Sequence, residues 1–374
     1  MSNSQKVFLQ LLQVSLWGKR MEDFQWGEWE KIDWEAVAQL AVEQTQIGLV
    51  TDALTRLPKE KRPPKVVFFN LIARVTDIED ENRRMNGIVP YLIAELGKAD
   101  CQPWLLKGQA VGRCYRKPEL RQAGDIDLLL TDEGQYQRAT ERMQKLTADE
   151  GRESTGRQHH EFWFKDILVE LHGEFSFIIC KQCTRNLPAW RQRHLQEQPV
   201  AVSVRENGVV YLPPLMFEVV FVFAHMMNHL MTGGVGLRQV MDCMMLMYRY
   251  YRQLDGQQLQ EELDFLGLTK FWRVYAAMAV DLLGYPKERM PLYDARFHRQ
   301  GEKMLTLIFK TGNFGHLQKE KQLSAESNRY MKKLVTAWGQ MPVYWRAGKI
   351  FPWESLYCFC QYSKRVLFSL GENN

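Results

Sequence analysis

The hydrophobic pattern changes its period near residue 101, and this change limits the folds that the chain can adopt. Before this point, apolar residues recur at helical spacing. Between residues 99 and 212, short apolar runs and alternating segments take over, which is typical of β-strands separated by helices. From Pro213-Pro214 onward the helical period returns. The sequence therefore predicts an α+β protein with a small mixed-sheet core at 99–212, between helical regions at 1–98 and 213–374.

Within the central region, Lys165-Asp166 separates two β-rich segments at a position typical of a hairpin turn. A polar helix is expected between the second and third strands, ending near Lys145. The predicted strands are Pro103–Lys107, Ile126–Leu130, Glu161–Phe164, Ile167–His172 and Val209–Leu212.

Composition narrows the class of protein without naming an activity. The net charge of +5 favours anionic ligands mildly and does not by itself imply nucleic acid. The N-terminus lacks the pattern of a signal peptide, and the most apolar segment, at 215–227, is interrupted by Glu218 and His225. Seven cysteines form no paired CxxC framework, which indicates reduced thiols. We therefore expect a cytoplasmic protein with no membrane span.

Two aspartates at alternate positions give the first chemical signal. In a strand, Asp125 and Asp127 point to one face while Ile126 and Leu128 point into the core. Their Cα atoms are then about 7 Å apart, so both carboxylates can converge on one hard divalent cation. Mg²⁺ or Mn²⁺ suits such a site, because each binds carboxylate together with phosphate oxygens.

A third carboxylate lies in a later strand. Glu170 is an acid among apolar neighbours, where a charge is costly unless it is paired or bound to metal. With Asp125 and Asp127 it would complete a two-metal arrangement and could accept a proton from the attacking group. His172 shares its face and is expected to contact a phosphate or the acceptor.

Phosphate binding is predicted at the turn after the first strand. Backbone N–H groups at a strand-to-helix turn hold phosphates, and a glycine lets the chain approach closely. Lys107, Gly108 and Gln109 occupy this turn. Arg121 is expected to neutralise the β- and γ-phosphates, and Gly124 completes the predicted nucleotide-binding set.

Taken together, these segments resemble the uncharacterised nucleotidyltransferase family of bacterial proteins, a branch of the polymerase-β-like superfamily, and especially its members from Bacteroidetes. The resemblance covers most of the chain, and its most specific parts are GDIDLLL and GLRQ. It is carried by LLKG (105–108), Tyr115, Pro118, Arg121, GDIDLLL (124–130), VELH (169–172), His225, His229, GLRQVMD (236–242) and GNFG (312–315).

The resemblance implies a polymerase-β-like core and metal-dependent transfer of a nucleoside monophosphate from an NTP, with release of pyrophosphate. The acceptor is left open between a small molecule, a protein and a glycan; DNA is not expected, and RNA is the less favoured choice. One departure is that Gly108-Gln109 stands where many superfamily members carry Gly-Ser or Gly-Gly. The alternatives are a non-catalytic nucleotide- or partner-binding module on the same fold, and an RNA-modifying nucleotidyltransferase.

Three further residues are candidates for the acceptor side. His225 and His229 are four apart on one helix face, but the glutamate of a zinc protease motif is absent between them. They are interpreted either as a structural pair beside the cleft or as contacts to nucleotide or acceptor. Arg238 precedes Asp242 in the less favourable order for a helix-surface ion pair, so we expect Arg238 to face the cleft.

Overall fold

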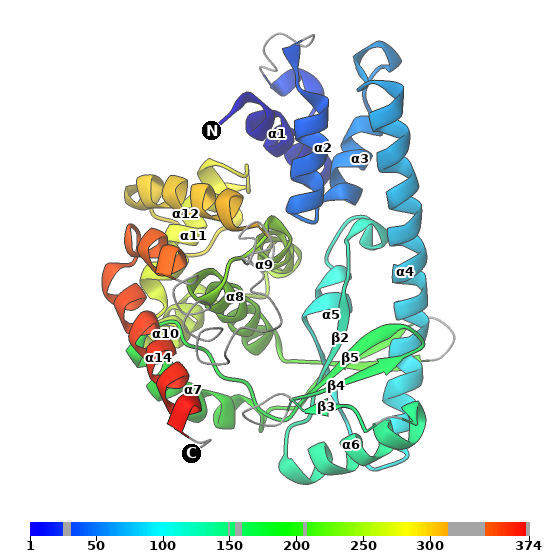
Figure 1. The fold of residues 1–374 in the computed structure, drawn as a ribbon, viewed down its shortest axis with the longest axis vertical. Coiled ribbons are helices and arrows are strands. Elements are labelled where there is room, and N and C mark those ends of the chain that lie inside the picture. The colour runs from blue at the N-terminus through cyan, green and yellow to red at the C-terminus, as the bar shows by residue number, and fades with distance from the viewer. Residues whose placement is uncertain (25–30, 149, 154–158, 205–207, 313–340, 372–374) are drawn as a thin grey trace.

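The protein is a mixed sheet flanked by helical regions, which confirms the predicted α+β class. A computed structural model describes residues 1–24, 31–148, 150–153, 159–204, 208–312 and 341–371. Residues 313–315 of the GNFG motif lie outside these ranges. Figure 1 shows one long helix running beside both the N-terminal helices and the sheet, with the C-terminal helices on the opposite side. The division into three regions stays a prediction.

Seven strands of the described residues form one sheet in the order β3-β4-β5-β2-β1-β7-β6. The central pair β2 and β5 is parallel, whereas β1–β2, β4–β5 and β6–β7 are antiparallel. All five predicted strands are present, and β3 and β6 were not predicted. The bounds are β1 (Trp104–Leu106), β2 (Asp125–Leu129), β3 (Arg152–Glu153), β4 (His159–Phe164), β5 (Ile167–His172), β6 (Val200–Val204) and β7 (Gly208–Leu212).

The turn between β4 and β5 contains only Lys165 and Asp166, both with positive φ (51° and 62°). Two central residues of this conformation match the right-handed twist of a hairpin. The prediction of a hairpin turn at this position is confirmed. Because the loop has two residues, it fixes the register of the two strands, so that His159 lies opposite His172 and Glu161 opposite Glu170.

The sheet has one apolar face and one mixed face. Ile126, Leu128 and Val169 are buried in a core with two helices, α4 (Lys65–Gly97) and α6 (Glu133–Thr147). On the other face, Trp104 and Leu129 belong to the core shared with the C-terminal helices. Three helices connect or cover the strands: α5 (Lys107–Gly112), α6 (Glu133–Thr147) and α7 (Lys181–His194).

The N-terminal region consists of helices that pack on each other and on the sheet. Its last helix continues to the sheet, where it packs on β7 and α6. It begins after Pro64 and ends at Gly97. These helices are α1 (Asn3–Trp17), α2 (Trp34–Glu43), α3 (Ile47–Thr55) and α4 (Lys65–Gly97).

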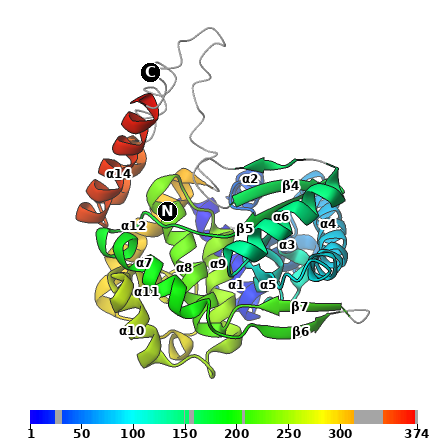
Figure 2. The same cartoon turned by 90° about the horizontal axis from the view of Figure 1, so that it is seen from below.

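The C-terminal helices lie beside the sheet, as Figure 2 shows from a second direction. Among the described residues, α8 is the helix long and apolar enough to cross a membrane, but 72% of it is buried inside the protein, as in the core helix of a globular protein. The helices are α8 (Leu215–Thr232), α9 (Leu237–Tyr250), α10 (Gly256–Leu266), α11 (Thr269–Asp281), α12 (His298–Thr311) and α14 (Pro352–Gly371).

A buried carboxylate joins the N-terminal helices to the loop that precedes β2. Asp52 on α3 accepts hydrogen bonds from Ser15 of α1 and from Lys117 of that loop, each at 2.7 Å, and it also pairs with Arg56. Burial opposes the charge, but the hydrogen bonds from Lys117 and Ser15 and the charge of Arg56 outweigh it and lower the pKa of Asp52. The ionised form therefore stabilises the fold.

We expect Asp52→Asn to lower the free energy of unfolding at pH 7 by about 1.5–3 kcal/mol, the range for hydrogen bonds to charged groups. Because the folded-state pKa lies below the ordinary value of 3.8, the difference should be full above pH 4 and shrink as the pH falls further. Denaturant unfolding of both proteins across this range measures it. An equal difference at every pH would contradict the ionic account.

Candidate functional site

Three carboxylates meet on the mixed face of the sheet. Asp127 on β2 lies directly beside Glu170 on the parallel strand β5, and Asp125 is two residues earlier on the same face. Ligand oxygens of all three lie within 4.8 Å of one another. The structure thus brings together the three residues predicted to bind metal, while Ile126 and Leu128 are buried on the opposite face.

The charges of this cluster are only partly balanced by the protein. The negative charge of Asp127, followed by burial, raises the pKa of Asp125 to about 6. Among the described residues, Asp127 Oδ2 is buried and has no hydrogen-bond partner. A buried carboxylate oxygen without a partner is costly. Oxygen ligands that converge in this way fit Mg²⁺ or Mn²⁺.

Lys107 supplies one positive charge to the cluster. Its Nζ lies 2.7 Å from Asp127 Oδ1, and the side chain is mostly buried. The residue has a φ of +43°, a conformation that costs a non-glycine residue about 1–3 kcal/mol. The backbone of Gly108 packs closely against β2, because a Cβ on Gly108 would lie 3.2 Å from the carbonyl oxygen of Asp125. This strained turn directs the ammonium group of Lys107 at the carboxylates.

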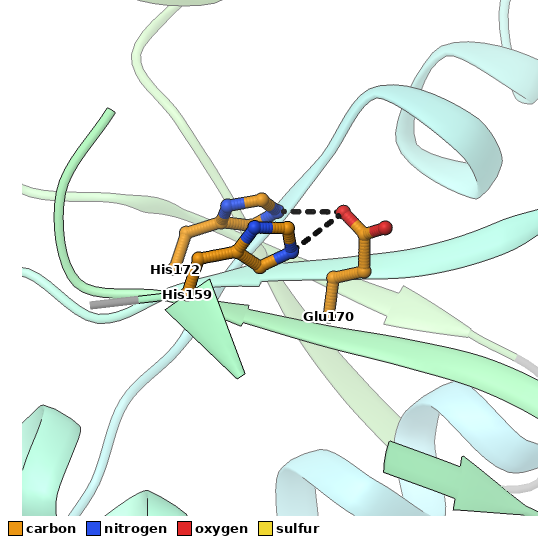
Figure 3. Close-up of side chains that lie close together, drawn as sticks. All are labelled: His159, Glu170 and His172. Carbon is orange, nitrogen blue, oxygen red and sulfur yellow. Dashed lines mark ion pairs between the residues drawn. The ribbon is translucent and has the colours of Figure 1, made fainter. Parts of the chain in front are cut away.

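Two histidines contact the same carboxylates. His172 Nε2 lies 2.8 Å from Asp127 Oδ1 and 3.3 Å from Glu170 Oε2. His159 Nε2 lies 3.2 Å from that same Glu170 oxygen, as Figure 3 shows. Burial disfavours the charge of Glu170, but the hydrogen bonds from the two imidazoles and the charge of Lys107 lower its pKa. Burial opposes the charge of His172, but the hydrogen bonds that its imidazole donates to Asp127 and Glu170 outweigh this effect and raise its pKa.

His159 was absent from the sequence prediction, although a signal for it existed. When the loop of a hairpin consists of residues 165 and 166, residues equally far from the loop on the two strands lie opposite each other. His159 is therefore opposite His172. Directly opposite residues of an antiparallel pair share a face. Glu161, opposite Glu170, reaches the same face by the same rule.

Arg121, predicted to contact the nucleotide, forms a buried ion pair with α9. Its Nε and Nη2 each donate to Asp242 on α9 at 2.7 Å, and both side chains are buried. Tyr115 donates to the same carboxylate at 2.8 Å. A protein carboxylate therefore binds one edge of the guanidinium in bidentate fashion, and Nη1 has no partner among the described residues. The ion pair joins the loop before β2 to α9, and the contact of Arg121 with the nucleotide stays a prediction.

Two other residues of the predicted nucleotide-binding set lie close to the cluster. The side chain of Gln109 donates to Asn86 of α4 at 2.9 Å, which ties the turn to that helix and leaves the backbone as the candidate phosphate contact. Gly124 is exposed and immediately precedes Asp125. A Cβ there would lie 3.8 Å from Arg238 Nη1.

The predicted acceptor-side residues face the same region. Arg238 Nη1 donates to the carbonyl oxygen of Gln122 at 3.0 Å, and its charge acts on Asp125. On α8, His225 and His229 approach each other to 3.0 Å between their Nε2 atoms. Burial and the charge of Lys107 lower the pKa of His225 far below its ordinary value, and that of His229 to about 4. Both rings are therefore neutral at pH 7, and one can donate to the other.

The mixed sheet, its flanking helices and the acidic cluster on one face are consistent with a nucleotidyltransferase-like core. The chain belongs to the family described as uncharacterised nucleotidyltransferase, whose sequence profile matches residues 30–284. This range contains the whole sheet and every predicted site residue. Neither the curated proteins nor the solved structures contain a significant match.

Proposed function

We propose that this protein transfers a nucleoside monophosphate from an NTP to an acceptor and releases pyrophosphate, on a core of the polymerase-β type. The observation that carries the proposal is the convergence of Asp125, Asp127 and Glu170 within 4.8 Å. Membership of the nucleotidyltransferase family supports it. When bound, Mg²⁺ or Mn²⁺ would neutralise phosphate charge and activate the attacking oxygen.

The chain's own residues supply positioning and charge, which provide most of the catalysis in phosphoryl chemistry. Asp125, Asp127 and Glu170 would hold the cation. The lowered pKa of Glu170 favours this ligand role over the acceptance of a proton. The ammonium group of Lys107 lies against Asp127. When a divalent ion binds Asp127 in its stead, this ammonium group would be free to contact a phosphate oxygen. The turn at Gly108 and Gln109 would hold the remaining phosphate oxygens through backbone N–H groups.

A labelling experiment tests the reaction class. The purified protein is incubated with Mg²⁺, native cell extract and ATP, GTP, CTP or UTP carrying the label on the α-phosphate, and a parallel set carries it on the γ-phosphate. We expect a macromolecule or metabolite to retain the α-label, and the γ-label to appear in pyrophosphate. Retention of the γ-label would show phosphoryl transfer instead. Asp125→Asn protein is the matched control and should add no label beyond that of the extract alone.

The acceptor is proposed to enter on the side of α8 and α9. We expect Arg238→Ala and His229→Ala each to reduce transfer, because both lie beside the carboxylates and outside the turn that would hold the triphosphate. Their affinity for a non-hydrolysable NTP, measured by calorimetry, should change little. A loss of NTP affinity as large as the loss of transfer would assign these residues to the nucleotide instead.

A further inference from the structure

Two imidazole rings and one carboxylate converge at the boundary of β4 and β5, beside the three-carboxylate cluster. His159 and His172 lie opposite each other in the hairpin. Their rings are stacked, with centroids 4.6 Å apart and planes inclined by 19°. Both present Nε2 to the same oxygen of Glu170 (Figure 3). The two strands thus hold three ligand atoms toward a common point, all within 4.8 Å of one another.

The distances match the edges of a tetrahedral metal site. A zinc ion bonds to nitrogen and oxygen at about 2.0–2.2 Å, which places neighbouring ligand atoms of a tetrahedron about 3.3–3.5 Å apart. The separations from Glu170 Oε2 are 3.2 Å to His159 and 3.3 Å to His172. Direct charge-assisted hydrogen bonds are shorter, about 2.7–2.9 Å. The two separations from Glu170 are therefore spaced like those of a ligand set, and His172 Nε2 in addition lies 2.8 Å from Asp127 Oδ1.

The donor set also separates this position from the magnesium site. Two histidines and one glutamate are the protein ligands of several catalytic zinc sites, which leave a fourth position open. Imidazole favours zinc and its neighbours among the transition metals, whereas carboxylate oxygens favour magnesium. Asp125 and Asp127 offer oxygen alone, so the two halves of the cluster differ in the ion that each prefers.

We infer that His159, Glu170 and His172 bind a divalent transition-metal ion of the zinc class, with Glu170 shared with the magnesium site of Asp125 and Asp127. The inference goes beyond the proposed function, because binding at this position requires no nucleotidyl transfer. It assigns His159 and His172 as ligands and makes the cluster a mixed-metal centre.

Calorimetric titration of Zn²⁺ into tag-free, metal-free full-length protein tests the inference. All proteins carry Cys360→Ser, because Cys360 is the exposed one of the seven free thiols. We expect one Zn²⁺ per chain and, in His159→Gln, an affinity at least about 100-fold lower, since even second-shell changes cost 10–100-fold. The matched control is His160→Gln, whose ring lies on the opposite face against Tyr136. It should bind Zn²⁺ like the parent protein.

Two further variants distinguish a loss of Zn²⁺ binding from a loss of the fold and from a loss of nucleotidyl transfer. His172→Gln should lose Zn²⁺ as His159→Gln does, and circular dichroism of both checks that the fold is retained. Asp125→Asn should keep Zn²⁺ binding although it loses nucleotidyl transfer, so failure of the proposed reaction does not affect the metal result. Parent-like affinity in His159→Gln, or an equal loss in His160→Gln or Asp125→Asn, would overturn the assignment.

Discussion

Asp127→Asn is expected to reduce nucleotidyl transfer by about 1,000-fold or more while the protein stays folded. Metal-assisted charge stabilisation contributes several kcal/mol to a transition state, and each 1.36 kcal/mol is a factor of ten in rate. Asp127 is central because it lies between Asp125 and Glu170 and is the most buried of the three. The fold should tolerate the change, since the charges of Asp125 and Glu170 still act on Lys107 and the repulsion that raises the pKa of Asp125 is relieved.

The measurement is the α-label assay at saturating NTP, together with Mg²⁺ titration and thermal unfolding. Asp166→Asn is the matched control. Its side chain is 96% exposed in the β4–β5 turn, and asparagine tolerates the positive φ of that position. We expect parent-like activity from the control. Parent-like transfer by Asp127→Asn would rule out a carboxylate-bound ion at this position.

Asp242→Ala is expected to lower the free energy of unfolding by about 3–5 kcal/mol, the usual cost of removing one partner of a buried ion pair. The substitution leaves the guanidinium of Arg121 buried without its carboxylate, and Tyr115 loses its acceptor. Asp242 belongs to the GLRQVMD segment. The expected effect gives this part of the motif a structural explanation: α9 holds the loop that leads into the strand carrying Asp125 and Asp127.

Chemical denaturation measures this loss, and Asp80→Ala is its control. Asp80 and Arg83 form an exposed pair on α4, where such pairs contribute about 0–1 kcal/mol. The double variant Arg121→Met with Asp242→Leu should recover most of the stability lost in Asp242→Ala, because apolar groups of similar size replace buried ion pairs at little cost. Equal effects of Asp242→Ala and Asp80→Ala would contradict the buried-pair account.

Local patterns in the sequence predicted the strands and the carboxylates well. The alternation in GDIDLLL determines which side chains of β2 face the core, and the two-residue loop at 165–166 determines the register of β4 and β5. Both are properties of consecutive residues, so no knowledge of the rest of the fold was needed. Extended along the whole hairpin, the same register rule also places His159 opposite His172.

Long-range partners could not be obtained in this way. Arg121 and Asp242 are 121 positions apart, and an arginine near an acidic motif predicts a phosphate contact as readily as an ion pair. Strand β6 was missed because Val200–Val204 is short and has no fully buried residue. Its place at the sheet edge depends on pairing with β7. The contact of Lys107 with Asp127 depends on a left-handed backbone conformation that residue type alone does not indicate.

The most direct test of the account is a crystal structure of the protein with Mn²⁺ and a non-hydrolysable NTP, in which anomalous scattering locates the metal. The account predicts a peak bound by Asp125, Asp127 and Glu170, with the triphosphate against that ion and over the turn at Lys107-Gly108. A nucleotide bound elsewhere, or a triphosphate whose Mn²⁺ contacts none of these three carboxylates, would contradict it.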